Sequence, residues 1–178
     1  ILKVDLKKLI KDEFDNKPFH VIANLPYYIT TPIIMQILES RLPVVSMTLM
    51  VQKEVADRMC ATCGSKEYGA LSVAVQYYTI PTVICRAEPH CFIPQPKVAS
   101  SVVHLKVSAT PTVTVSDEKK FFAIVKSSFG QRRKTLLNAL SKSPYFSANK
   151  DNVRSALVQM GVDENIRGEK LSISQFAK

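Results

Sequence analysis

Apolar, β-branched stretches alternate with stretches of helical periodicity over residues 6–107, and this alternation limits the folds that the chain can adopt. The stretches typical of strands are 20–23, 44–51, 82–85 and 98–107, and those typical of helices are 31–38, 52–59 and 69–78, after a short helix or turn at 6–13. Strands that alternate with helices form a parallel or mixed sheet. We therefore expect an α/β domain over residues 1–110.

The composition shifts at residues 109–112, which predict a linker. Beyond it Asp117 and Glu118 suit the start of a helix, where the helix dipole favours acidic side chains. Gly161 is a stop signal for a later helix. The predicted helices after the linker cover 117–129, 131–140 and 152–160. We expect a small all-α C-terminal domain over residues 111–178.

Composition and charge narrow the class of protein. Hydrophobic residues make up 46% and charged residues 22% of the 178 positions, as in an ordinary globular protein. No apolar run approaches the ~20 residues that span a bilayer, and no signal-peptide pattern is present, so we expect a cytoplasmic protein. The net charge of +9, from 24 Lys+Arg against 15 Asp+Glu, favours an anionic partner, nucleic acid first and a membrane surface second.

The four cysteines are Cys60, Cys63, Cys85 and Cys91. Cys60 and Cys63 form a C-x-x-C pair, and His90 lies beside Cys91. Because no second pair with zinc-ligand spacing follows, we expect free reduced thiols and no metal. A metal site or a disulfide stays the alternative.

The stretch Asn24-Leu25-Pro26-Tyr27 follows a predicted strand, at the edge of the sheet where α/β proteins bind ligands. The Asn24 side-chain oxygen can accept a hydrogen bond from an exocyclic amine. Pro26 restricts Leu25 to extended conformations that can aim its carbonyl at the same amine. The Tyr27 ring offers a face for stacking, so the four residues suit a flat ring that carries an NH₂ group. The alternative is a strand-end turn that binds nothing, since Asn and Pro are common turn residues.

Residues 92–100, FIPQPKVAS, predict an extended loop with two prolines ahead of a strand. Phe92 stands at the mouth of this loop, and we expect it to face Tyr27 as the second aromatic wall of a base-sized slot. Stacking of this kind is worth about 1–3 kcal/mol per base. The alternative is a rigid connection in which Phe92 anchors the core.

Eight basic residues and no acidic one lie between residues 119 and 150. A solvated helix face is the ordinary interpretation of a charge run. Cations at a helix start are unfavourable by about a few tenths of a kcal/mol, which phosphates bound there would offset. We therefore expect RNA contacts from Gln131, Arg132, Arg133 and Lys134. We also expect RNA contacts from Asn138 in the same segment and from Lys53 in the first domain.

Three segments, NLPYYITTP, FIPQPKVASSVV and FGQRRKTLLNAL, resemble the ribosomal RNA adenine N6,N6-dimethyltransferase family, in particular its KsgA-type small-subunit members. The stretches MVQKEVADRM, YGALSVAVQYY and MGVDENIRGEKLSISQFAK extend the resemblance over essentially the whole chain. NLPY alone is shared by many amino-methyltransferases. FxPxPxVxS at this distance narrows the resemblance to adenine dimethylation of RNA, and RRKTLLNAL favours the small-subunit enzymes.

The resemblance implies a Rossmann-like methyltransferase domain, a helical C-terminal domain and S-adenosylmethionine as methyl donor. It implies dimethylation at N6 of two adjacent adenines near the 3′ end of small-subunit ribosomal RNA, within an immature small subunit and without a membrane partner. Asn24 and the Leu25 carbonyl would hold the target amine next to Pro26, and Tyr27 and Phe92 would stack on the extruded base. Asn24 would also lie against the cofactor.

The sequence departs from the family pattern at its front. The strand, glycine-rich loop and acidic residue that bind the cofactor in the family have no counterpart in these 178 residues. We therefore expect a partial Rossmann-like domain without its N-terminal strands, inactive alone and able to form a non-native dimer through a bare edge at 20–25. Two alternatives stay open: a non-catalytic rRNA-binding or ribosome-assembly module, and a large-subunit rRNA adenine methylase.

Overall fold

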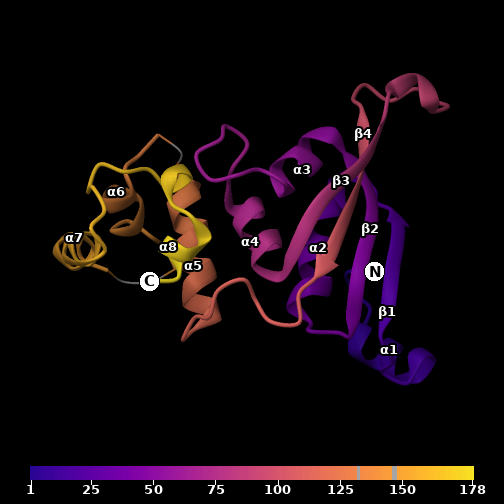
Figure 1. Cartoon of the computed structure of the whole chain (residues 1–178), viewed down its shortest axis with the longest axis horizontal. Coiled ribbons are helices and arrows are strands. Elements are labelled where there is room, and N and C mark those ends of the chain that lie inside the picture. The colour runs from indigo at the N-terminus through magenta and orange to yellow at the C-terminus, as the bar shows by residue number, and fades with distance from the viewer. Residues whose placement is uncertain (132, 146–147) are drawn as a thin grey trace. The chain divides into compact units, whose positions relative to one another are not determined.

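The computed structural model describes residues 1–131, 133–145 and 148–178, and Figure 1 shows the arrangement of its elements. The first part of the chain contains α1 (Leu6–Phe14), β1 (Phe19–Asn24), η1 (Tyr27–Ile29), α2 (Thr30–Glu39), β2 (Val44–Gln52), α3 (Lys53–Met59), α4 (Ala70–Tyr78), β3 (Thr79–Ala87), η2 (Pro89–Cys91) and β4 (Ser100–Val107). The second part contains α5 (Glu118–Gly130), α6 (Leu136–Leu140), α7 (Lys150–Gln159), η3 (Gly168–Lys170) and α8 (Ile173–Phe176). The predicted mixed α/β fold is confirmed.

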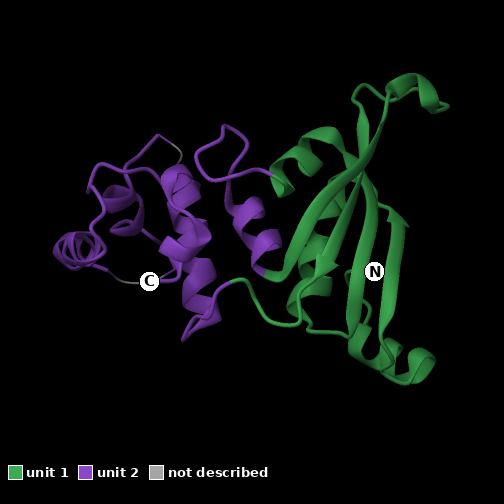
Figure 2. Ribbon diagram, viewed as in Figure 1, with its two compact units in different colours: residues 1–60, 78–112 green, residues 61–77, 113–178 purple. Residues whose placement is uncertain are grey.

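The chain divides into two compact units, coloured separately in Figure 2. Unit 1 comprises residues 1–60 and 78–112, and unit 2 comprises residues 61–77 and 113–178. Within unit 2, the Tyr77 ring of α4 packs 5.0 Å from the ring of Phe121, which explains why 61–77 groups with the later helices. The domain boundary between residues 110 and 111 stays a prediction.

The sheet of unit 1 has the strand order β1-β2-β4-β3. Strand β1 pairs with β2 in parallel, whereas β4 is antiparallel to both β2 and β3. Strands β1 and β3 therefore form its two edges. Strand β3 begins three residues earlier than predicted and includes Pro81, because an edge strand can tolerate a residue that donates no hydrogen bond.

The two faces of this sheet differ in burial. One face contributes Met47, Leu49 and Val51 from β2 and Val103 and Leu105 from β4, all essentially inaccessible to solvent. Helix α3 packs against β2, β3 and β4.

The opposite face is open. On it Ile22 of β1 is 83% exposed, and Ile80 of β3 is also exposed. Two hydrogen-bonded pairs lie on this face: His20 Nδ1 with Ser46 Oγ at 2.8 Å, and Thr48 Oγ1 with His104 Nδ1 at 2.9 Å. These pairs satisfy polar side chains on a face that the rest of unit 1 leaves uncovered.

Unit 2 is a helical core closed by its last segment. Its buried apolar residues include Phe121, Val125, Leu136, Leu137, Val153, Leu157, Leu171 and Phe176. Gly168 is required where the chain approaches α5, because a Cβ built there would lie 2.8 Å from the carbonyl oxygen of Ser128. Gly161 ends α7 with a φ of 64°, a left-handed conformation that suits glycine.

The predicted helix at 131–140 is wrong in its first half. Helix α6 starts at Leu136, and Thr135 is its N-cap, with the hydroxyl accepting from the N–H of Asn138 at 3.4 Å. Arg133 and Lys134 precede the helix in a turn. They therefore lie outside the helix, and the expected cost of cations within its first turn does not apply to them.

Among the described residues, no helix combines the length and the apolar character needed to cross a membrane.

Candidate functional site

The end of β1 is held in a fixed conformation by main-chain and side-chain hydrogen bonds. Asn24 is its last residue and pairs with Met50 of β2. The Leu25 N–H continues the ladder and donates to the Met50 carbonyl oxygen at 3.1 Å. Pro26 has φ −58° and ψ 132°, and its carbonyl accepts from the hydroxyl of Thr30 at 3.0 Å. Tyr27 then opens η1, so the chain turns away from the sheet directly after the predicted motif.

Two acceptor groups at this strand end are available to a ligand. In the described part of the chain, no hydrogen bond involves the Asn24 carboxamide or the Leu25 carbonyl oxygen. The Asn24 side chain is exposed, while Leu25 is buried by its side chain. The Leu25 side chain thus anchors the turn in the core, while its carbonyl oxygen accepts no hydrogen bond from the described residues.

A pocket of about 370 Å³ lies at this strand end. It is lined by Asn24, Leu25, Pro26, Tyr27, Met50, Phe92, Ile93, Pro94 and Pro96. The structure therefore brings all five predicted catalytic residues to one cavity. Their roles stay predictions, because no bound base defines them.

Phe92 reaches the pocket from the connection between β3 and β4, which extends beyond the end of the sheet in Figure 1. The connection contains the short helix η2, and the Phe92 N–H donates to the Pro89 carbonyl oxygen at 3.2 Å. The Ile93–Pro94 peptide bond is cis. Phe92 is half-buried and Ile93 is fully exposed. Phe92 therefore lines the pocket and is not one of the buried core residues of unit 1.

A hydrogen bond that the sequence did not reveal joins the motif at residues 24–27 to the motif at residues 92–100. The Tyr27 hydroxyl lies 2.8 Å from the Ser100 hydroxyl, across 73 positions of sequence. Ser100 is the first residue of β4 and is completely buried. It pairs with Gln52 of β2 on one side and Ala87 of β3 on the other, so it is fixed by neighbours in both directions.

The cation predicted in unit 1 is paired with a carboxylate. Lys53 Nζ donates to Asp57 Oδ2 at 2.7 Å, one helical turn along α3. Arg86 of β3 approaches the other oxygen of Asp57 at 3.9 Å, and its side chain is 57% exposed. Sequence reasoning missed Arg86. It lies next to Ala87, the partner of Ser100, and adds a positive charge beside Lys53.

The cations predicted in unit 2 are exposed. Gln131, Arg133 and Lys134 all lie on the surface of the turn before α6, whereas Arg132 lies outside the described residues. The Asn138 side chain instead donates to the Thr135 hydroxyl at 3.0 Å. This bond ties Asn138 to the helix cap.

The cysteines do not assemble a metal centre. All four are free thiols, and the described residues contain no group of three or more metal-ligating His, Cys, Asp or Glu side chains. Burial raises the pKa of the Cys60 thiol, and the negative charge of Asp57 raises it further. Burial also raises the pKa of Cys63, partly opposed by Lys170.

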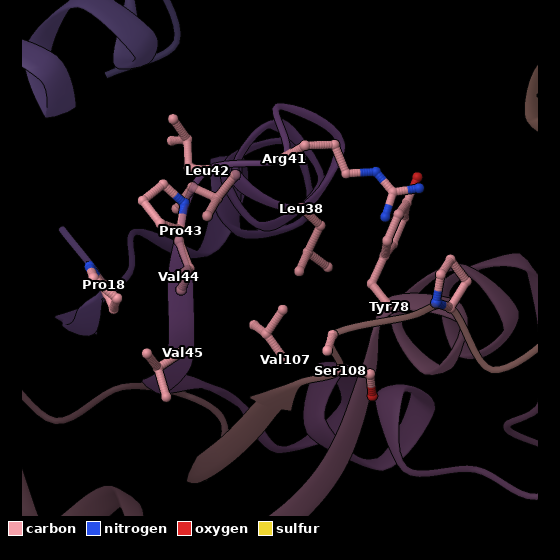
Figure 3. Close-up of a pocket in the computed structure, with 13 residues that line it drawn as sticks. Pro18, Leu38, Arg41, Leu42, Pro43, Val44, Val45, Tyr78, Val107 and Ser108 are labelled. Atoms are coloured by element: carbon pink, nitrogen blue, oxygen red, sulfur yellow. The ribbon is translucent and has the colours of Figure 1, made fainter. Parts of the chain in front are cut away.

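A larger cavity of about 510 Å³ lies at the opposite end of β2 (Figure 3). Val44 and Val45 start β2 there, and the guanidinium of Arg41 lies 4.8 Å from the centre of the Tyr78 ring at its rim. Its walls are mainly aliphatic and proline side chains. Recognition of a base requires directed polar groups as well as apolar walls, so the smaller pocket is the stronger candidate.

Over residues 1–178 the sequence matches the family described as "Ribosomal RNA adenine dimethylase". The chain belongs to this family. Two curated relatives, both named "Ribosomal RNA small subunit methyltransferase A", come from Alkaliphilus oremlandii, at 53% identity over 176 residues, and Clostridioides difficile, at 52% over 177 residues. Each alignment covers 99% of this chain and 61% of the relative, so the chain spans less than two-thirds of their length.

Solved structures confirm the Rossmann-like fold. A dimethyladenosine transferase from Plasmodium falciparum superposes with a TM-score of 0.75 at 24% identity, covering 88% of this chain and 63% of that one. The 23S rRNA methyltransferase ErmE superposes with a TM-score of 0.64 at 19% identity, covering 99% of this chain and 77% of that one.

The residues present do not make up a complete site for the methyl donor that the family uses. All five glycines lie at or after position 64, so none lies in the turns after β1 or β2 where a glycine-rich cofactor loop could form. Strand β1 is an edge, so no further strand of the described chain flanks Asn24 on its other side. The role of Asn24 as a contact to S-adenosylmethionine stays a prediction.

Proposed function

We propose that this chain provides the base-binding half of a small-subunit rRNA adenine N6-dimethyltransferase. The carrying observation is the pocket in which two unpaired acceptors, the Asn24 carboxamide and the Leu25 carbonyl, lie with the rings of Tyr27 and Phe92. The two relatives, 53% and 52% identical to this chain, are named as methyltransferases of small-subunit rRNA. Their names favour small-subunit rRNA over large-subunit rRNA as the substrate.

The two acceptors match the two hydrogens of an adenine amine. The nitrogen lone pair of that amine is delocalised into the ring, which makes it a weak nucleophile. Hydrogen bonds from both N–H groups to Asn24 and Leu25 favour a pyramidal nitrogen, with its lone pair directed away from the acceptors. The described residues that line the pocket include no carboxylate or imidazole, so positioning would carry the catalysis.

Stacking on the Tyr27 and Phe92 rings would offset the free energy that is needed to extrude the base. Removing an adenine from its stack costs about a few kcal/mol. Stacking on an aromatic side chain returns about 1–3 kcal/mol per base. Tyr27 and Phe92 together therefore offset the cost of extrusion, and the pocket would favour the extruded base over the stacked one.

We propose that exposed cations bind the phosphates of the RNA backbone. In unit 2 these are Arg133 and Lys134, together with the polar Gln131, and Arg132, also predicted, lies outside the described residues. In unit 1 Arg86 joins Lys53, whose charge is partly neutralised by Asp57. The immature small ribosomal subunit is the proposed source of the RNA, in the cytoplasm.

The test is binding of the chain to an RNA oligonucleotide with the two adjacent adenines from near the 3′ end of small-subunit rRNA. We expect tighter binding than to the same RNA with both adenines replaced by uridine, and tighter binding than to a large-subunit fragment of equal length. Equal affinity for all three would support a non-catalytic RNA-binding module and refute the proposal. A preference for the large-subunit fragment would favour the third alternative.

A polypeptide of these 178 residues should bind S-adenosylmethionine poorly and turn over no substrate, because Asn24 is its one expected contact. Calorimetry that gives low-micromolar binding would refute this expectation.

The β1 edge and the exposed Ile22 favour association with a second copy of the chain. A concentration-dependent dimer should appear in light scattering, and a monomer at the highest soluble concentration would contradict it.

A further inference from the structure

The hydroxyl pair of Tyr27 and Ser100 connects the motif after β1 to the start of β4, and nothing in the base-binding scheme above uses it. The two oxygen atoms are 2.8 Å apart. Tyr27 is 37% exposed at the start of a short helix, whereas Ser100 is fully buried in the interior of the sheet. One partner is therefore in a surface turn and the other is at the buried start of an inner strand.

We propose that Ser100 is the positioning residue that sets the orientation of the Tyr27 ring for stacking on the adenine. The proposal rests on the function proposed above. Ser100 is paired on both sides, with Gln52 and Ala87, and the preceding Ala99 carbonyl accepts from the Lys53 N–H at 2.9 Å. A hydroxyl held this firmly gives the Tyr27 ring a fixed point at its far end.

The ring of Tyr27 has two torsions that the surface turn alone would leave adjustable. Its backbone end is fixed by the turn at Pro26 and its hydroxyl end by Ser100. Fixing both ends sets χ1 and thus the direction of the ring axis, whereas rotation about that axis leaves the phenol oxygen in place. A pre-set axis increases affinity because the side chain loses less rotational freedom when the base docks.

The hydrogen bond also favours stacking by the Tyr27 ring over the alternative role, in which the Tyr27 hydroxyl contacts RNA directly. A phenol that bonds to Ser100 presents its ring face to the pocket and keeps its hydroxyl in the protein. If the hydroxyl contacted RNA, its removal would weaken binding whether or not Ser100 were present.

The variants are Ser100→Ala, Tyr27→Phe and the double variant, with Ser101→Ala as a matched control. Ser101 is the next residue of β4 and equally buried, but its hydroxyl has no hydrogen-bond partner among the described residues. The control therefore removes a buried hydroxyl from the same strand without touching Tyr27.

Docking is measured by fluorescence on an RNA with the two adjacent adenines and 2-aminopurine in place of the nucleotide 5′ to them. Its emission rises when the neighbouring adenine leaves the stack, and a titration gives the affinity. Loss of one hydrogen bond predicts that S100A and Y27F each weaken docking by roughly threefold to tenfold. The double variant should bind no more weakly than either single variant, and S101A should bind as the unmodified chain does.

Thermal unfolding without RNA gives an independent readout. Y27F leaves the fully buried Ser100 hydroxyl without a partner, whereas S100A leaves unpaired the hydroxyl of Tyr27, a residue that is 37% exposed. Y27F should therefore lower Tm more than S100A, and adding S100A to Y27F should restore part of the loss. Strictly additive Tm shifts would mean that the two hydroxyls do not interact, which overturns the proposal.

The outcomes separate this proposal from the function on which it rests. If the unmodified chain extrudes the adenine and S100A does so equally well, Ser100 is not a positioning residue and the base-binding function stands. If Y27F weakens docking and S100A does not, the phenol contacts RNA directly and the proposal fails. If the unmodified chain does not change the emission of the two-adenine RNA, the proposed function fails, and the role of Ser100 in it fails too.

Discussion

Replacing Phe92 by Ala should weaken binding of an adenine-containing RNA by about fivefold to 150-fold. This range is the 1–3 kcal/mol that one aromatic stack contributes per base, converted at 1.4 kcal/mol per factor of ten. Phe92 lines the pocket, is half-buried and lies outside the buried core of unit 1. The substitution should therefore leave the free energy of unfolding within about 0.5 kcal/mol of the unmodified chain.

The assay is a fluorescence titration of the two-adenine RNA, with thermal unfolding of each variant as the check on folding. Phe92→Tyr keeps a ring and should bind within about threefold of the unmodified chain, whereas Phe92→Leu keeps apolar volume without a π face and should behave like F92A. Ile93→Ala changes the neighbouring, fully exposed side chain and controls for a general effect of the loop.

Two results would refute the stacking argument. Equal affinity of F92A and the unmodified chain would mean that Phe92 does not face the base. Equal affinity of F92L and F92Y would mean that apolar volume is sufficient and that no ring is needed.

Three further outcomes test other parts of the account. Replacing Arg133 and Lys134 by Ala should flatten the plot of log K against log salt by about 0.7 for each lost phosphate contact, and an unchanged slope would make the pair a solvated surface. Gly168→Ala should destabilise the chain by about 1–3 kcal/mol in urea, because the added Cβ meets a backbone oxygen at 2.8 Å. Gly130→Ala, with nothing within 4 Å of its added Cβ, should cost less than about 0.5 kcal/mol, and equal costs would contradict this packing argument. Cys60 should react with iodoacetamide at pH 8 more slowly than the exposed Cys85 and Cys91, since its raised pKa lowers the thiolate fraction, and equal rates by peptide mass spectrometry would contradict this.

The sheet could be predicted because its strands are runs of β-branched and apolar residues with clear boundaries. Residues 44–51, for example, differ from β2 by one position at the end. The start of α6 could have been predicted as well: Thr135 is an N-cap residue three positions before Asn138, a stronger local signal than the helical periodicity that extended the prediction to Gln131. The pairing of Lys53 with Asp57 likewise follows from their spacing of four on a helix.

The position of Phe92 in the same pocket as Asn24 could be predicted through the resemblance to the family. The partnership of Tyr27 with Ser100 could not, because it joins residues 73 positions apart and depends on the register of three strands. The motif FxPxPxVxS ends at Ser100, but it does not indicate that this hydroxyl bonds to Tyr27 whereas that of Ser101 has no partner among the described residues. Similarly, only the packing of β3 beside α3 places Arg86 near Asp57.

In the proposed function, Asn24 and the Leu25 carbonyl hold the amine of an adenine. The direct measurement compares the affinity of the chain for the two-adenine RNA with its affinity for the same RNA carrying purine, which lacks the amine, at the target position. Two hydrogen bonds at about 0.5–1.5 kcal/mol each predict a preference for adenine of roughly fivefold to 150-fold, and Asn24→Ala should reduce that preference to roughly its square root because the Leu25 carbonyl remains. Equal affinity for adenine and purine, or a preference that Asn24→Ala leaves unchanged, would contradict the account.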